Sequence, residues 1–222
     1  AEKTLADLLK VYPNDAQLWS EYGNILSSLD DYSGAINAYK KSLSLLPEND
    51  KNNWSIFYAL GVTYDQNGEK DKGEDILLKA LEMSDRDAIV LNYIGFSWLE
   101  EGKNIDEAGN MIYEAYNKYP LEGHIIDSLG WLFYRIGNYE KAVEYLEQAS
   151  DMNPANAVIS DHLGDAYWMN GRKNEALFQW NHSLVLKEDA DMINHKTIKA
   201  KAENGLLNVK VLKLKDENLI KN

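Results

Sequence analysis

The side chains of this sequence that could do chemistry are four histidines and a surplus of carboxylates. His162 stands next to Asp161 and three residues before Asp165, which makes this the densest group of such side chains. Catalysis or metal binding would need a nucleophile, a phosphate loop or a second histidine at helical spacing beside them, and none accompanies this group. Solvated or helix-capping side chains are the favoured interpretation. We therefore expect no catalytic residue, no metal site and no cofactor, and the chain is predicted not to be an enzyme.

The overall charge bears on the class of partner. The formal net charge is −13, which opposes nucleic acids and anionic lipid, because binding to them relies on basic side chains that displace counterions. From Lys196 onward seven lysines stand against three acids, so this end carries +4 and the rest of the chain −17. The sequence thus predicts an acidic body with a basic tail and no nucleic-acid partner.

Hydropathy and cysteine content say less. With 45% hydrophobic residues the chain can form a buried core, yet no apolar run approaches the roughly 20 residues that cross a bilayer. We expect no membrane insertion of this fragment. The absence of cysteine fits a reducing or an oxidising compartment equally well, so it leaves the location open.

An apolar residue followed by glycine recurs along the chain. The glycines are Gly23, Gly61, Gly95, Gly130 and Gly164, at spacings of 38, 34, 35 and 34 residues. Small residues follow each of them at two regular distances, with a large apolar residue in between. Small residues let two helices approach closely, and stacked neighbours bury the faces that one helix pair cannot bury alone. The pattern predicts an all-α solenoid with five full repeats.

The unit that begins at Leu129-Gly130 and continues with Ala142, Leu146 and Pro154 resembles the tetratricopeptide repeat family, and all five units agree with it in register. The resemblance implies a right-handed superhelical solenoid of antiparallel helix pairs. The DSLGW and HLGDAYW elements further resemble proteobacterial envelope lipoproteins that act as adaptors, some of which recruit a C-terminal-processing protease. This second resemblance implies a bacterial adaptor, points to the periplasm with the cytoplasm still open, and offers a processing protease as partner.

The repeat pattern also predicts how the two ends of the sequence relate to the repeats. Pro13 lies 34 residues before Pro47, which predicts that the chain begins in the middle of a repeat and is a fragment or a processed form. A capping helix is expected near the other end, with Met192, Ile193 and Ile198 on its inner side and Gly205 as its stop. The expected divisions are a truncated repeat at 1–15, full repeats at 16–53, 54–87, 88–121, 122–155 and 156–188, the capping helix at 189–205 and a basic tail at 206–222.

A second stripe lies on each predicted first helix, three residues before the glycine and one and four residues after it. This spacing puts the three positions on one face, and the resemblance implies that this face lines a concave groove. Aromatic residues at positions that the core does not require indicate a binding surface, whereas the alternative is that they pack on a neighbouring repeat or the cap. The candidate partner-binding residues are Tyr58, Asn92, Phe96, Leu99, Asp127, Trp131, Tyr134, Arg135, Asp161, Asp165 and Trp168.

The first functional hypothesis is a protein-interaction module that holds an apolar or basic peptide or protein in this groove. Arg135 is expected to pair with Asp161 or with an acid of the ligand. The alternating segment from Val209 to Lys215 either folds back into the groove, binds the groove of a neighbouring copy or stays solvated. Two alternatives remain: a homo-oligomeric scaffold that assembles through its ends or by tail exchange, and an accessory domain of a larger enzyme.

Overall fold

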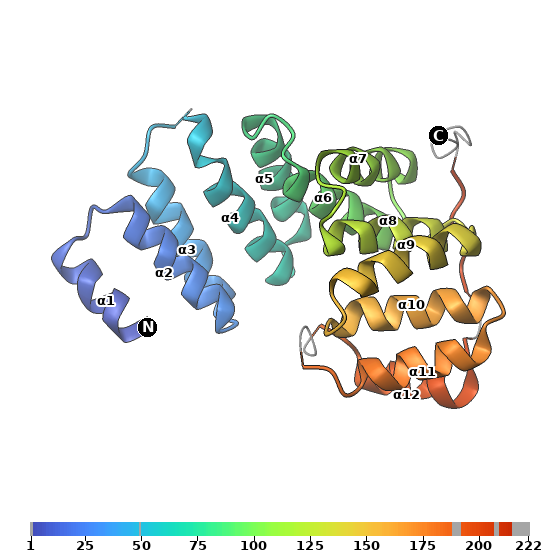
Figure 1. Ribbon diagram of the computed structural model, residues 1–222. Coiled ribbons are helices and arrows are strands. Elements are labelled where there is room, and N and C mark those ends of the chain that lie inside the picture. The colour runs from blue at the N-terminus through green and yellow to red at the C-terminus, as the bar shows by residue number, and fades with distance from the viewer. Residues whose placement is uncertain (1, 49, 188–191, 207–208, 215–222) are drawn as a thin grey trace. The chain divides into compact units, whose positions relative to one another are not determined.

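The computed structural model describes residues 2–48, 50–187, 192–206 and 209–214, and within these ranges every regular element is a helix (Figure 1). The chain divides into two compact units, residues 1–90 and 91–222, and each is described by itself. None of the described helices is both long enough and apolar enough to cross a membrane.

Unit 1 is built from two helix pairs and a preceding single helix. Its elements are α1 (Glu2–Val11), α2 (Ala16–Ser28), α3 (Tyr32–Ser44), the short 3-10 helix η1 (Lys51–Asn53), α4 (Trp54–Gln66) and α5 (Lys70–Met83). Helix α2 packs against α3 and α4 against α5, while α3 joins the pairs by contacting α4. Asp15 and Asp31 cap α2 and α3 by accepting hydrogen bonds from first-turn amides. The core between the pairs consists of Leu26, Ala35, Ile36, Ala38, Tyr39, Leu60 and Tyr64.

Unit 2, taken by itself, is also built from helix pairs. Its elements are α6 (Ala88–Glu101), whose first turn still belongs to unit 1, α7 (Ile105–Lys118), α8 (Gly123–Arg135), α9 (Tyr139–Met152), α10 (Ala157–Met169), α11 (Lys173–Ser183) and α12 (His195–Asn204). Helices α8 and α9 form one pair and α10 and α11 the next, with α9 against α10 between them. Helix α8 also contacts α10 directly, and α12 packs on α11, so α12 closes this end of the stack.

The recurring glycines stand where two helices cross closely. A Cβ atom placed on Gly95 would lie 2.9 Å from the backbone oxygen of Ala108 on α7, closer than a carbon atom can approach. Seven residues after four of the packing glycines comes a second glycine that turns the chain into the next helix. These turn glycines have positive φ, which a residue without Cβ adopts at little cost: Gly68, Gly102, Gly137 and Gly171.

Two buried serines tie second helices to first helices. The Ser42 hydroxyl donates to the backbone oxygen of Ala16 at 2.6 Å, and the Ser183 hydroxyl donates to that of Ala157 at 2.7 Å. Both serines occupy the repeat position that alanine fills in the middle repeats. Each therefore satisfies its hydroxyl inside the core without disturbing the packing of the pair.

The capping helix differs from its predicted extent. Residues 188–191 lie outside the described part of the chain, and α12 begins only at His195, because Asn194 caps it by accepting a hydrogen bond from the Thr197 amide. Met192 precedes the helix and is 72% exposed, so its predicted place on the inner side is wrong. Ile198 is buried as expected, and Gly205 follows the last residue with φ of 75°.

Candidate partner-binding groove

The helices place the predicted groove residues in two settings. Tyr58 lies on α4 in unit 1, where burial, with a smaller contribution from Asp87, raises the pKa of its hydroxyl to about 12. All the other candidates lie in unit 2, on α6, α8 and α10. Those that keep part of their surface exposed are Asn92, Phe96, Arg135, Asp161 and Trp168, whereas Leu99, Asp127, Trp131, Tyr134 and Asp165 are buried.

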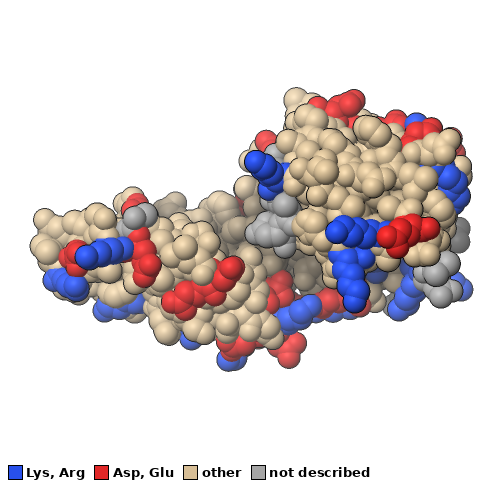
Figure 2. Space-filling view, turned by 90° about the horizontal axis from the view of Figure 1, so that it is seen from below, with Lys and Arg blue, Asp and Glu red and all other residues tan. Residues whose placement is uncertain are grey.

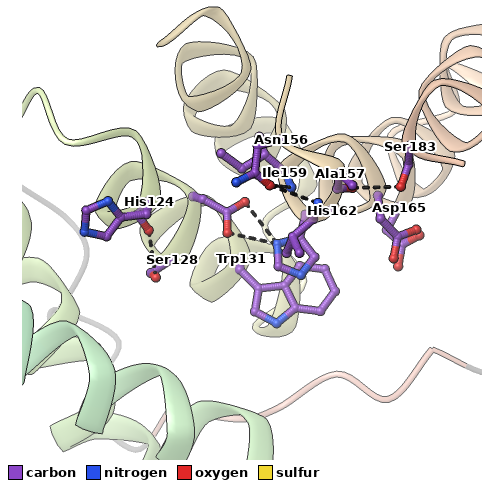
Figure 3. A network of polar contacts seen from close by, with 12 residues as sticks. His124, Ser128, Trp131, Asn156, Ala157, Ile159, His162, Asp165 and Ser183 are labelled. Carbon is purple, nitrogen blue, oxygen red and sulfur yellow. Dashed lines mark hydrogen bonds and ion pairs between the residues drawn. The ribbon is translucent and has the colours of Figure 1, made fainter. Parts of the chain in front are cut away.

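Trp131 of α8 lies at the centre of a stack of rings. Its indole is parallel to the imidazole of His162 on α10, with ring centres 4.0 Å apart and an interplanar angle of 15° (Figure 3). Tyr134 stacks on the indole at 4.5 Å and 12°. Parallel rings at such distances contribute beyond their buried area. The stack therefore joins α8 to α10, and these aromatic residues stabilise the unit whether or not a partner also uses them.

His162 pairs with Asp127. Its Nδ1 atom lies 3.0 Å from both carboxylate oxygens, and the two side chains are 11% and 9% exposed. Burial on its own lowers the pKa of the imidazole, but the Asp127 carboxylate, with Asp161 and Asp165 further away, raises the pKa overall. The interpretation of His162 as a solvated or capping side chain is thus wrong. Asp127 and Trp131 stand one repeat before His162 on the preceding first helix, and this spacing could have predicted the contact.

Glu100 at the end of α6 binds two candidates on α8. Its Oε1 atom accepts a hydrogen bond from Trp131 Nε1 at 2.7 Å and also pairs with the Arg135 guanidinium. Arg135 therefore pairs with Glu100, not with Asp161 as one of the two sequence expectations had it. Sequence reasoning missed Glu100, although it lies four residues after Phe96 on the same helix face.

Lys201 of α12 brings a cation to Asp161 and Asp165, two carboxylates of the predicted groove. Its Nζ atom lies 2.9 and 3.0 Å from the Asp161 oxygens and 2.8 Å from the nearer Asp165 oxygen, and its side chain is 14% exposed. Burial raises the pKa of Asp165 to about 6, against the opposing effect of the Lys201 ammonium. The acid pair therefore already holds a lysine, and sequence reasoning missed that residue because the predicted inner face of the cap was apolar.

Two residues of the stripe accept hydrogen bonds from large side chains of the core. Trp180 Nε1 donates to Asp165 Oδ1 at 2.8 Å, and the Tyr39 hydroxyl donates to Asn24 Oδ1 at 2.7 Å, with a separation of 15 residues in both cases. In each case the acceptor follows the packing glycine directly. The expectation that the core does not require the stripe is thus wrong for the buried Leu99, Trp131 and Tyr134, and also in the first and last repeats. There the stripe residue satisfies a polar atom of a large buried side chain.

The electrostatic setting is mixed. Figure 2 shows one face of the molecule, on which basic side chains lie among acidic ones and form no continuous basic patch. Among the described residues, no cluster of three or more His, Cys, Asp or Glu side chains could hold a metal ion. The candidate residues and their partners offer stacked rings, carboxylates that bind a lysine, and partly exposed apolar surface at Phe96 and Trp168.

Comparison with known proteins bears on the repeat directly. Family models for the tetratricopeptide repeat match residues 16–49, 55–87 and 128–192. The chain belongs to the tetratricopeptide repeat family. TPR-containing proteins are also among its relatives: PA4667 of Pseudomonas aeruginosa is 28% identical over 67% of this chain and 24% of its own length. MJ1428 of Methanocaldococcus jannaschii is 26% identical over 78% of this chain and 31% of its own length. The chain thus spans about a quarter to a third of these TPR relatives.

Solved structures agree on the TPR fold. The Cut9–Hcn1 complex of the APC/C contains a chain that superposes on 91% of this one with a TM-score of 0.78 and 16% identity, and 39% of that chain is covered. YrrB, described as a TPR protein with an unusual peptide-binding site, covers 91% of this chain and 99% of its own with a TM-score of 0.57 and 17% identity. At such identities the likeness shows the TPR solenoid alone.

Proposed function

We propose that this protein is an interaction module that binds an apolar and basic segment of a partner protein along α6, α8 and α10 of unit 2. The TPR fold supports a protein or peptide partner. The observation that carries the finer proposal is the contact of Lys201 with Asp161 and Asp165, because it shows a lysine side chain bound by two carboxylates of the predicted groove. A partner lysine would bind these carboxylates by taking the place of Lys201.

Partly exposed rings supply the apolar part of the proposed surface. Phe96 on α6 and Trp168 on α10 are the aromatic candidates of unit 2 that are not buried. Aromatic side chains contribute much of the binding energy at protein interfaces, and carboxylates beside them add selectivity for basic partners. YrrB, a structural neighbour, is described as having a peptide-binding site, which is in keeping with this use of the fold. The bacterial adaptor role, the periplasmic location and a processing protease as partner stay predictions.

Photo-crosslinking locates the binding surface. The photoreactive residue p-benzoylphenylalanine replaces Phe96 or Trp168 in the full chain, and a random peptide library is offered under illumination. We expect both positions to crosslink peptides that are rich in Lys, Arg and large apolar residues. Capture should weaken as salt is raised from 0.05 to about 0.5 M, because the Debye length falls well below 10 Å.

The matched control places the same photoreactive residue at Phe178 on α11, which is 65% exposed and outside the stripe. This control position should capture little and should show no preference for basic peptides. Equal capture at Phe178, or an absence of capture at Phe96 and Trp168, would contradict binding along α6, α8 and α10.

Self-assembly is the second candidate, and α1 carries the observation that favours it. Leu8, Val11 and Tyr12 are 39%, 67% and 56% exposed on or just after this helix. Contiguous exposed apolar side chains mark surfaces that bind other proteins. Light scattering should then show a mass that rises with concentration for the wild type and stays monomeric for Val11→Asp. A constant monomer mass for the wild type excludes this candidate.

A further inference from the structure

The described part of the tail, residues 209–214, lies across the ends of two first helices of unit 2. The Leu212 amide donates a hydrogen bond of 2.7 Å to the backbone oxygen of Arg135, the last residue of α8, and the Leu212 side chain is only 8% exposed. Figure 1 draws this stretch as an elongated trace without helix or strand. Its neighbours Lys210 and Lys213 remain exposed.

The receiving surface is made by the helix turns themselves. The last carbonyls of a helix lack an intrahelical donor, which leaves the Arg135 oxygen free to accept from another segment. The turn glycines keep the approach open: a Cβ on Gly137 would lie 3.1 Å from Val211 Cγ1, and one on Gly102 would lie 3.6 Å from Leu212 Cδ2. A backbone acceptor and a slot for one branched side chain therefore stand side by side.

We infer that the surface formed by the ends of α6 and α8 is a peptide-binding site that residues 209–214 occupy as an internal ligand. The name strand site is used for this surface, after the elongated segment that it holds. The inference rests on the proposed function and names its partner more closely. The partner segment is non-helical, carries a branched apolar residue with a free amide in the Leu212 position, and has basic residues on both sides of it. It binds by displacing the tail from the strand site.

Two observations define this chemistry. Only Leu212 of residues 210–213 is buried, and only its amide has a backbone partner in the described structure, so one side chain and one N–H carry the recognition. The part of the chain ahead of Lys196 has a formal net charge of −17. The lysines that flank Leu212 therefore favour association of the tail with this acidic part. A tethered segment competes at an effective concentration on the order of millimolar, so a free peptide binds well only after the tail is released.

The test uses a fluorescein-labelled peptide of residues 206–215 and the full chain. Leu212→Ser removes the buried side chain and should release the tail. We expect the peptide to bind this variant at least about tenfold more tightly than it binds the wild type. Lys213→Arg, which keeps the positive charge at the exposed neighbouring position, is the matched control and should bind the peptide like the wild type.

A second peptide tests the hydrogen bond. Methylation of the backbone nitrogen that corresponds to Leu212 removes the donor to Arg135 and should abolish binding to the Leu212→Ser chain, whereas methylation at the Lys213 nitrogen should weaken it far less. If Leu212→Ser fails to fold, excess unlabelled peptide is added to the wild type, and hydrogen exchange at the Leu212 amide should then accelerate. No tighter binding by a folded Leu212→Ser chain, or equal effects of the two methyl groups, overturns the strand site.

The outcomes for the two proposals are separable. Loss of crosslinking at Phe96 and Trp168 with peptide binding intact removes the groove and keeps the strand site. Crosslinking at those positions with no peptide binding to the released chain removes the strand site alone.

Discussion

His162 on α10 directs its Nδ1 atom between the two carboxylate oxygens of Asp127 on α8, at 3.0 Å from each. Because the carboxylate accepts, Nδ1 carries the proton. Burial opposes the charged imidazole, yet Asp127, Asp161 and Asp165 together raise its pKa above the usual value of about 6.5. The contact therefore contributes stability fully below that pH, and the contribution is lost as the pH rises through the folded pKa.

The first prediction follows from the loss of this stabilising contribution at high pH. The difference in free energy of unfolding between wild type and His162→Gln should shrink as the pH rises from about 6 toward 9, because the unfolded imidazole already loses its proton near 6.5. Urea denaturation at closely spaced pH values measures the difference. His124→Gln, a change of an exposed side chain on α8, is the control and should leave the wild-type curve unchanged. Parallel curves for wild type and His162→Gln would contradict the assignment.

The second prediction concerns the attachment of α12. Lys201→Met leaves Asp161 and Asp165 without their cation, and removing one partner of a largely buried ion pair costs about 3 kcal/mol. Hydrogen exchange of the α12 amides should accelerate strongly, and the denaturation midpoint should fall if α12 unfolds together with unit 2. Lys199→Met, two residues away and exposed, should change stability by no more than about 0.5 kcal/mol. Similar exchange in both variants would show that Lys201 does not hold the helix.

The third prediction addresses the close helix crossing at Gly95. In Gly95→Ala the new methyl group meets the Ala108 backbone oxygen at 2.9 Å, and a backbone atom cannot turn away as a side chain can. Overpacking should destabilise the fold by about 1 to 3 kcal/mol, more than the roughly 1 kcal/mol that alanine gains in helix propensity. Asn110→Ala on the exposed face of α7 isolates the propensity effect and should be neutral or slightly stabilising. Thermal and urea unfolding measure whether Gly95→Ala lowers or raises the free energy of unfolding.

The fourth prediction separates stability from binding at Asn92. Its Oδ1 atom is buried and has no hydrogen-bond partner in the described structure. An apolar residue of similar size removes that unsatisfied acceptor, so Asn92→Leu should raise the free energy of unfolding by about 1 kcal/mol. Under the proposed function, the same variant should capture fewer peptides at the neighbouring Phe96 position, because the amide is part of the groove. A loss of stability would mean that the Asn92 side chain makes contacts that the fold needs.

The sequence predicted the helical solenoid because its signals are local and repeated. Gly95 and Ala108 lie within one helix pair, and the same small residues return in every repeat, so agreement among repeats compensates for the weakness of each match. The positions of Trp131 and Asp165 on the equivalent faces of α8 and α10 followed from helical periodicity in the same way. Their burial did not follow, because it depends on what covers that face.

Contacts between distant segments had no local signal. Lys201 reaches Asp161 over a separation of 40 residues, and the connection into α12 lacks the repeat pattern that aligned the other helices. Leu212 pairs with Arg135 through the backbone, and a backbone hydrogen bond leaves no mark on side-chain identity. Charge alone indicated that a basic C-terminal segment suits an acidic body, and it could not select the atoms involved.

The hydrogen bonds from Tyr39 to Asn24 and from Trp180 to Asp165 limit how freely the repeats can be exchanged. In the repeat of α8 and α9 the equivalent positions hold Trp131 and Leu146, and the Leu146 side chain has no polar atom for the first helix to satisfy. A chimera that joins α8 to α11 would leave the indole nitrogen of Trp180 buried without its carboxylate. Each helix pair is therefore inherited as a matched set, and a designed shuffle of these repeats has to cut between pairs and never within one.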